Sequence, residues 1–206
     1  GMDKKTENKQ IRIAIQGGFG AFHEIAATHY FNDSNIEIMP NNTFKDLMKS
    51  LRKRQADYGI MAIENSLAGS ILQNYNLIKD SHMHITGEIY LRIRQNLCAL
   101  KGQKIKDIVE VYSHPMAILQ CQLFFDKYPG IKLIESIDTA LSAKMISDEN
   151  LYGKAAIASD LAAKKYGLEI LASGIETNKM NYTRFLILKE DNGYPNSNEI
   201  NKSSIR

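Results

Sequence analysis

The stretch Asn181-Tyr182-Thr183-Arg184-Phe185 places an amide, a hydroxyl and a guanidinium directly before the apolar run Phe185-Leu186-Ile187-Leu188. Such a run is typical of a buried strand. Ligands bind at strand ends in open α/β sheets, and arginine can hold a carboxylate through two parallel hydrogen bonds. A threonine hydroxyl can donate to a substrate oxygen. The segment therefore predicts a ligand site, although by itself it also fits a strand that starts with a solvated arginine.

Short β-branched runs alternate with helix-like patterns along most of the chain. This rhythm predicts parallel or mixed sheets flanked by helices, and hence an α/β fold class. The expected strands are 11–15, 36–39, 58–63, 108–112, 131–134, 155–158 and 168–172. The expected helices are 21–31, a helix capped by Thr43, 69–79, 115–128, 139–147 and 160–166.

The rhythm breaks between residues 79 and 100. Here 85–100 forms one long extended segment, carrying Arg92 and Arg94, with no helix inside it. Such a segment fits a strand that leaves one α/β unit and enters another, and the return would fall near 173–183. We therefore predict two α/β lobes with a cleft between them, and clefts between lobes are preferred ligand sites. The first lobe would be 11–84 plus 176–190, the second 85–175, with 191–206 a linker or the start of another domain.

Polar groups gather at three strand-to-helix junctions. The loop Gly17-Gly18-Phe19-Gly20 could let the backbone approach an anion at a helix N-terminus, or could simply form a tight turn. It does not satisfy the dinucleotide-binding fingerprint. Glu64-Asn65-Ser66, with Gly69 and Ser70, carries more polar groups than helix capping uses.

The third of these junctions is Ser113-His114-Pro115, where Ser113 is sufficient as a helix cap. Gln120 lies about two helical turns later on a similar face, so a ligand role for the pair needs support from elsewhere. A further junction, Asp138-Thr139, is interpreted as a helix cap only.

Composition narrows the function classes. The 206 residues are 44% hydrophobic and 24% charged, as expected for a soluble globular protein. A net charge of +3, without a basic run interleaved with aromatics, gives no indication of nucleic-acid binding. No apolar run approaches the roughly 18 residues of a membrane span, and residues 3–10 lack the apolar core of a signal peptide. Cys98 and Cys121 are expected to be buried free thiols, and the histidines show no metal-ligand spacing.

Taken in order, the motifs resemble those of the prephenate dehydratase family from about Ile11 to Leu188. The final motif, after all the others, makes the resemblance specific. The matching segments are the glycine loop ending in Phe22, Glu64-Asn65-Ser66 with Gly69, Gly87-Glu88, Ser113-His114-Pro115 with Gln120-Cys121, Thr139-Ala140, Ala155-Ala156-Ile157-Ala158-Ser159 with Ala162-Ala163, Tyr166-Gly167-Leu168, and Asn181-Tyr182-Thr183-Arg184-Phe185.

The resemblance implies two α/β lobes similar to type II periplasmic binding proteins, with the active site between them. It implies Thr183 as the catalytic hydroxyl. The expected catalytic residues are Thr183, Asn65, Ser113 and Gln120, and the expected substrate-binding residues are Arg184, Glu64, Ser66, Gly69, Asn181, Phe185, Gly20 and Phe22.

The implied activity is the decarboxylating dehydration of prephenate to phenylpyruvate in L-phenylalanine biosynthesis. Alternatives are an arogenate dehydratase, or a non-catalytic module of the same fold that binds small anions. We expect no metal and no cofactor, a cytoplasmic location, and a homo-oligomer, either a dimer or a tetramer. The polar tail up to Arg206 resembles the approach to a regulatory ACT domain, so the native chain is expected to continue.

Four residues depart from the family pattern. Gly18 stands where the family usually has proline, His23 where it has serine or threonine, Gln95 where it has histidine, and Met116 where it has glutamine. None of these changes removes the Thr183–Arg184 pair, but Gln95 and Met116 leave the hydrogen bonding around the site open.

Overall fold

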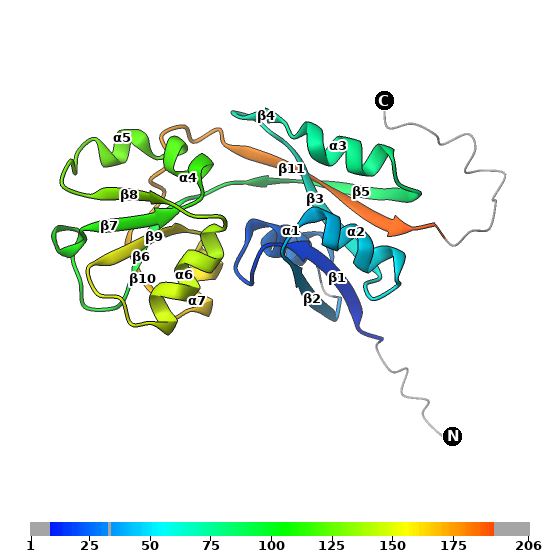
Figure 1. The fold of residues 1–206 in the computed structure, drawn as a ribbon, viewed down its shortest axis with the longest axis horizontal. Coiled ribbons are helices and arrows are strands. Elements are labelled where there is room, and N and C mark those ends of the chain that lie inside the picture. The colour runs from blue at the N-terminus through cyan, green and yellow to red at the C-terminus, as the bar shows by residue number, and fades with distance from the viewer. Residues whose placement is uncertain (1–8, 33, 192–206) are drawn as a thin grey trace, which may run out of the picture.

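The computed structural model describes residues 9–32 and 34–191. These residues form two α/β lobes, each built on its own β-sheet (Figure 1). The predicted α/β class with two lobes is confirmed. No helix within the described ranges is long and apolar enough to cross a membrane. The predicted linker over 191–206 lies, apart from its first residue, outside the described part of the chain.

The first lobe contains β1 (Ile11–Gln16), β2 (Ile36–Asn41), β3 (Tyr58–Asn65), β4 (Gly69–Ser70), β5 (Met83–Arg92) and β11 (Tyr182–Glu190). The strand order is β2-β1-β3-β11-β5, and the short β4 pairs with β3. Strands β1, β2 and β3 are parallel, whereas β11 runs antiparallel between β3 and β5. The C-terminal strand therefore completes a sheet that the N-terminal strands begin.

Helices cover both faces of this sheet. Helix α1 (Phe22–Tyr30) packs on one face, and α2 (Phe44–Arg52) and α3 (Leu72–Lys79) pack on the other. Side chains alternate along a strand, so β11 contributes to both cores: Phe185 joins the core under α1, and Leu186 joins the core under α2 and α3. Burial of apolar side chains on both faces stabilises the sheet.

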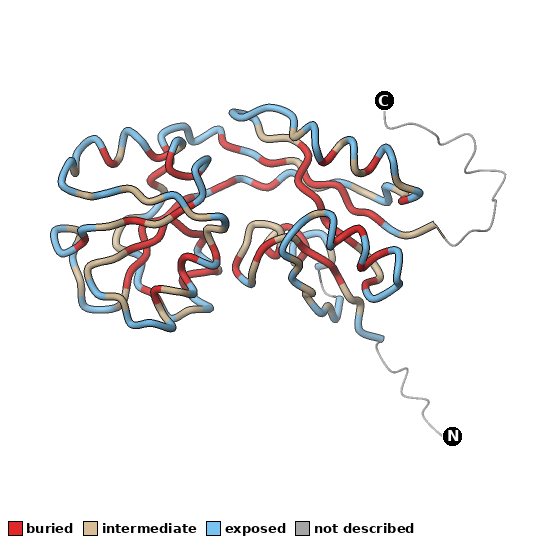
Figure 2. Tube along the Cα trace, in the orientation of Figure 1, coloured by how far each residue is buried: buried red, intermediate tan, exposed pale blue. Residues whose placement is uncertain are grey.

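The second lobe contains β6 (Asn96–Ala99), β7 (Glu110–Ser113), β8 (Lys132–Glu135), β9 (Lys154–Ala158) and β10 (Glu169–Ala172), in the order β10-β6-β9-β7-β8. Its helices are α4 (Pro115–Gln120), α5 (Gln122–Phe125), α6 (Thr139–Asp148) and α7 (Asp160–Lys165), with a 3-10 turn at Ile105–Asp107. One core lies under α4 and α5, and another lies under α6 and α7. Figure 2 shows the central strands of both lobes as buried, with exposed segments around them.

Two chain segments cross between the lobes, one after β5 and one before β11 (Figure 1). They are hydrogen-bonded to each other: the N–H of Ile93 donates to Asn181 O at 2.8 Å, and the N–H of Ile175 donates to Gln95 O at 2.8 Å. All of β5 pairs with β11 in the first sheet, and β6 begins the second. The outward crossing is therefore at residues 93–95, rather than at the predicted start of the second lobe at residue 85.

Two expected helices differ in extent. Residues 69–70 form β4, and α3 begins only at Leu72. The expected helix 115–128 is interrupted at Cys121, whose φ of −111° and ψ of 12° are not helical, so α5 starts afresh at Gln122. A 3-10-type hydrogen bond from the N–H of Cys121 to Ile118 O closes the first piece.

Candidate active site

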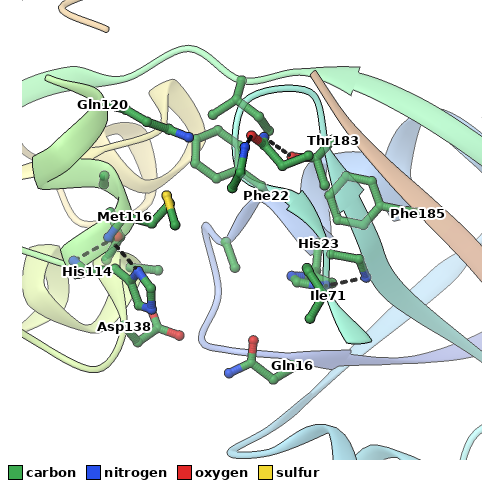
Figure 3. Close-up of a pocket in the computed structure, with 18 of the residues that line it drawn as sticks. Gln16, Phe22, His23, Ile71, His114, Met116, Gln120, Asp138, Thr183 and Phe185 are labelled. Carbon is green, nitrogen blue, oxygen red and sulfur yellow. Dashed lines mark hydrogen bonds between the residues drawn. The ribbon is translucent and has the colours of Figure 1, made fainter. Parts of the chain in front are cut away.

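A cavity of about 450 Å³ lies between the two lobes, beside the crossing segments (Figure 3). The first lobe supplies the start of α1 and parts of β3 and β11 to its wall, and the second supplies residues of α4 and the start of α6. The volume is in the range of small-molecule binding sites. The cleft predicted between the lobes is therefore present.

Five residues predicted for the site line this cavity: Phe22, Asn65, Gln120, Thr183 and Phe185. Antiparallel pairing of β11 with β3 sets Thr183 directly opposite Asn65. Phe22 begins α1 and Gln120 ends α4, so the two lobes each contribute. Residues that are far apart in the sequence are thus brought to one wall by the sheet register and by the lobe crossing.

A chain of amide hydrogen bonds connects Thr183 to the second lobe. Asn65 Nδ2 donates to Thr183 Oγ1 at 3.0 Å and to Asn181 Oδ1 at 2.8 Å. Asn181 Nδ2 then donates to Gln120 Oε1 at 2.8 Å. Because Asn65 occupies the hydroxyl oxygen as a donor, the O–H of Thr183 stays available to a ligand. Likewise, Gln120 is held through its oxygen, and its NH2 group remains as a donor.

Asn181 and Ser113 were expected in the site, and both lie behind the wall with 0% exposure. Asn181 has both ends of its amide bonded, to Asn65 and to Gln120. Ser113 Oγ lies 3.1 Å from Thr139 Oγ1 and donates to Ile157 O at 3.3 Å. As placed, these two residues hold lining residues in position and do not themselves face the cavity.

The start of α6 is part of the wall. Asp138 caps the helix, accepting the N–H of Leu141 at 3.0 Å, which confirms the cap interpretation. Asp138 and Thr139 also line the cavity, although neither was predicted as a site residue from the sequence. The sequence does carry an indication of a site here, because Asp138-Thr139 is a polar strand-to-helix junction like the others. A helix-cap motif alone, however, does not indicate that a cavity lies opposite it.

His23 lines the cavity from α1, with its ring against Phe185 in an edge-to-face contact of 5.0 Å between centroids and beside Phe44 at 5.4 Å. Its Nε2 accepts a hydrogen bond from the N–H of Ala62 at 3.2 Å (Figure 3). Burial lowers the pKa of His23 to about 4, because the charged imidazolium loses its hydration there. At neutral pH the ring is therefore uncharged.

Gln95 lines the cavity from the first crossing segment and is only 4% exposed. Its backbone N–H donates to Glu176 Oε2 at 2.9 Å, which fixes the main chain. Its side-chain Oε1 is buried and has no hydrogen-bond partner among the described residues. Met116 is also in the wall. Three of the four departures from the family pattern, His23, Gln95 and Met116, thus lie at the cavity.

The glycine loop makes contact between the lobes. Gly20 has a φ of +91°, and an added Cβ would lie 2.7 Å from Ala162 Cα, so both the conformation and the space require glycine. Ser159 Oγ donates to Gly20 O at 2.6 Å, and Tyr166 Oη donates to Phe19 O at 2.6 Å. Gly20 is not among the lining residues, and the structure gives it a packing role.

The junction after β3 is positioned beside the cavity. Ser66 Oγ donates to Met180 O at 2.8 Å and accepts the N–H of Tyr182 at 2.9 Å, which ties this junction to the start of β11. Gly69 has a φ of +82° and pairs with Asn65 at the start of β4. Glu64 pairs with Arg184 in the β3–β11 ladder. Ser66, Gly69 and Glu64 are not among the lining residues.

Arg184, expected to hold a substrate carboxylate, is paired with Glu88 instead. Its Nε and Nη2 lie 2.7 Å and 2.6 Å from Glu88 Oε2. Because side chains alternate along β11, Arg184 points to the sheet face opposite that of Thr183 and Phe185. It is not among the lining residues. In this geometry Arg184 would have to leave Glu88 and change faces to reach a ligand in the cavity.

The cavity is suited to binding and orienting a small polar molecule. Its wall combines aromatic and aliphatic side chains with a few hydrogen-bonding groups. None of the described lining residues is lysine or arginine. Burial raises the pKa of Cys98 and of Cys121 to about 12, and both are buried free thiols as predicted. Neither is a cavity residue, so the candidate chemical groups are the hydroxyls of Thr183 and Thr139, the amides, the histidines and the carboxylate of Asp138.

Comparison with known proteins identifies the family. The family model for prephenate dehydratase matches residues 13–193. Arogenate dehydratase/prephenate dehydratase 2 of Arabidopsis thaliana is 39% identical over 201 residues, which are 97% of this chain and 52% of that protein. The chain thus spans about half the length of the curated relatives it matches.

Solved structures with a similar fold include a member of the same family. The prephenate dehydratase of Arthrobacter aurescens, in complex with L-Phe, has a TM-score of 0.79 at 26% identity, over 90% of this chain and 62% of that chain. GqqA, described as a novel type of quorum quenching acylase, also has a TM-score of 0.79, at 29% identity over 90% of this chain and 66% of that one. Because the family model covers most of its length, this chain belongs to the prephenate dehydratase family.

Proposed function

We propose that this chain catalyses the decarboxylating dehydration of prephenate to phenylpyruvate, a step of L-phenylalanine biosynthesis. The observation that carries the proposal is the Thr183 hydroxyl, which lines the cavity between the lobes and is held by Asn65 with its own proton free. Family membership supports the same assignment.

The reaction needs little bond-making from the protein. The bond between the ring and its carboxylate breaks, and its electron pair enters the ring as CO₂ leaves. The C–O bond to the ring hydroxyl breaks, and hydroxide departs to be protonated to water. Aromatisation drives both steps, so the enzyme has to orient prephenate and stabilise the negative charge that develops on the leaving oxygen.

The cavity residues fit these two tasks. The Thr183 O–H is a donor to the leaving oxygen, and Asn65 fixes its direction. The NH2 group of Gln120, held in place through Asn181, is a second donor from the opposite lobe. Threonine is a weak acid, so it acts here as a directed hydrogen-bond donor that stabilises the charge. Substrate contact by both lobes would also explain why the network crosses between them.

Arogenate, which carries an amino group in place of the keto group of prephenate, is the second candidate substrate. The carboxylate of Asp138 in the cavity wall is a group that an ammonium could approach. The Arabidopsis relative is named for both activities. Relative kcat/KM for the two compounds would measure the preference.

The test is to incubate the purified chain with prephenate and to follow phenylpyruvate by its absorbance at high pH, with arogenate in a parallel assay. Turnover above the spontaneous rate, lowered on the order of 100- to 1000-fold in a Thr183→Val variant, is the expected result. Tight prephenate binding without product would instead show a non-catalytic binding module. Absence of both binding and turnover would refute the proposal.

The cytoplasmic location and the homo-oligomeric state remain predictions. The Arabidopsis relative is named as chloroplastic. Fractionation of the native cells and size-exclusion chromatography with light scattering would test the two predictions separately.

A further inference from the structure

His23 is a cavity residue that the proposed mechanism does not use. It is the second residue of α1 and lines the cavity, with its ring against that of Phe185 (Figure 3). The ring of Phe44 also lies beside it. The family resemblance gave it no role, since serine or threonine is usual at this position.

The hydrogen bond from Ala62 determines which ring nitrogen carries the proton. Ala62 N–H donates to Nε2 at 3.2 Å, so Nε2 must be unprotonated. A neutral imidazole then carries its hydrogen on Nδ1. The lowered pKa of His23, about 4, agrees with the neutral form. Nδ1 has no hydrogen-bond partner among the described residues, so its N–H is a donor that the protein leaves unused.

The charges around the cavity show which ligand group this donor suits. No lysine or arginine lines the described cavity wall, and the nearby Arg184 is paired with Glu88 on the other face of the sheet. Asp138 is the acidic residue of this wall and offers no donor to a carboxylate, so neutral donors would hold a substrate with two carboxylates there. Neutral N–H groups bind carboxylates well when they are fixed in place and shielded from water.

We propose that the Nδ1–H of His23 donates a hydrogen bond to a carboxylate of the substrate, which makes His23 a substrate-binding residue. This inference deepens the proposed function and depends on it for the identity of the substrate. The bond from Ala62 sets the tautomer, and the packing of the ring on Phe185 sets its direction.

Two substitutions separate the two edges of the ring. In His23→Gln, the longer amide can reach the Nε2 position and accept the N–H of Ala62, but nothing donates from the Nδ1 position. In His23→Asn, the shorter amide can donate from the Nδ1 position, while the hydrogen bond to Ala62 is lost. A structural role would make His23→Gln the milder variant, and a substrate role would make His23→Asn the milder one.

The experiment measures kcat/KM with prephenate for the wild type and both variants, with thermal unfolding as a check on folding. We expect His23→Gln to lower kcat/KM about 10- to 100-fold, as for a lost hydrogen bond to a charged group, with little change in Tm. His23→Asn should stay within about 5-fold of the wild type, even though its Tm falls. Wild-type kcat/KM in folded His23→Gln, or equal losses in both variants, would overturn the inference.

If the proposed function is wrong, the wild-type protein will turn over neither prephenate nor arogenate, and this is measured before the variants. In that case calorimetric binding of phenylpyruvate tests the His23 inference on its own. Binding weakened in His23→Gln and retained in His23→Asn would support a carboxylate donor. Equal binding by all three proteins, or no binding by any of them, would overturn it.

Discussion

The two faces of β11 present adjacent residues to different surroundings. On one face Thr183 and Phe185 line the cavity, where an amide network and a neutral histidine supply hydrogen-bond donors. On the other face Arg184 forms an ion pair with Glu88, in which the two side chains are 30% and 47% exposed. The cavity face holds neutral dipoles that are fixed by hydrogen bonds, and the opposite face holds full charges that are partly exposed to water.

The two faces differ in how much binding energy they can supply to a ligand. A dipole that is fixed and shielded from water acts strongly on a developing charge and needs no reorganisation. An exposed ion pair is screened by solvent and typically contributes about 0–1 kcal/mol. We therefore expect large effects for substitutions on the cavity face of β11 and small effects on its opposite face.

The largest effect is expected for Thr183→Val, which removes the hydroxyl and keeps the shape. Loss of one well-placed donor costs on the order of 100- to 1000-fold in kcat, measured as initial rates of phenylpyruvate formation. Thr183→Ser keeps the hydroxyl and is the matched control. A valine variant with more than about half of the wild-type kcat would show that the two faces do not differ in the way described.

A pH effect is expected from His23, whose folded pKa of about 4 lies below its ordinary value of 6.5. Between these values the unfolded chain binds a proton that the native protein does not, so stability falls as the pH is lowered from about 6.5 to about 4. Across the whole window, the difference between the folded and unfolded pKa of His23 lowers the free energy of unfolding by on the order of 3 kcal/mol. Urea unfolding across this window measures the loss.

His23→Gln should flatten this part of the pH profile, while His29→Gln, at an exposed position of the same helix, should not. An identical pH slope in the wild type and in His23→Gln would contradict the assignment of a buried neutral ring to the cavity face.

Asn181→Ala tests the connection between the two lobes. The substitution leaves the Asn65 and Gln120 amides without their shared partner at a position of 0% exposure. We expect the free energy of unfolding to fall by about 1–3 kcal/mol, with a parallel loss of activity. Asn178→Ala, in an exposed part of the same segment, is the control. Equal small effects for both variants would mean that the network does not hold the site together.

The smallest effect is expected for Arg184→Lys, on the opposite face. An exposed ion pair contributes little, so kcat/KM should change by less than about 3-fold. Steady-state kinetics with prephenate measures this. A tenfold rise in KM would show that Arg184 reaches the substrate during turnover. It would support the carboxylate-binding role that was predicted for Arg184 from the sequence motif.

Much of the fold followed from local pattern. The alternation of β-branched runs with helical patterns located most strands and helices, and the helix-free stretch before residue 100 located the lobe crossing to within about ten residues. The antiparallel insertion of β11 between β3 and β5 brings Thr183 to Asn65. The motif resemblance placed both residues in the site but did not predict this pairing, because strand order is a non-local property that periodicity does not encode.

The composition of the site was harder to predict. Alternation along a strand separates Thr183 from Arg184, but the pattern does not tell which face borders the cavity. Asp138 was identified as a helix cap, which it is, without any local sign that a cavity lies opposite. The tautomer of His23 depends on Ala62, 39 residues away in the sequence. Such contacts are set by packing between elements.

A crystal structure of this chain with phenylpyruvate bound would show directly which face of β11 meets the ligand. We expect the ligand in the cavity between the lobes, within hydrogen-bond distance of Thr183 or Gln120 and of His23, with the Arg184–Glu88 pair intact. A ligand held by Arg184, or bound outside this cavity, would contradict this expectation.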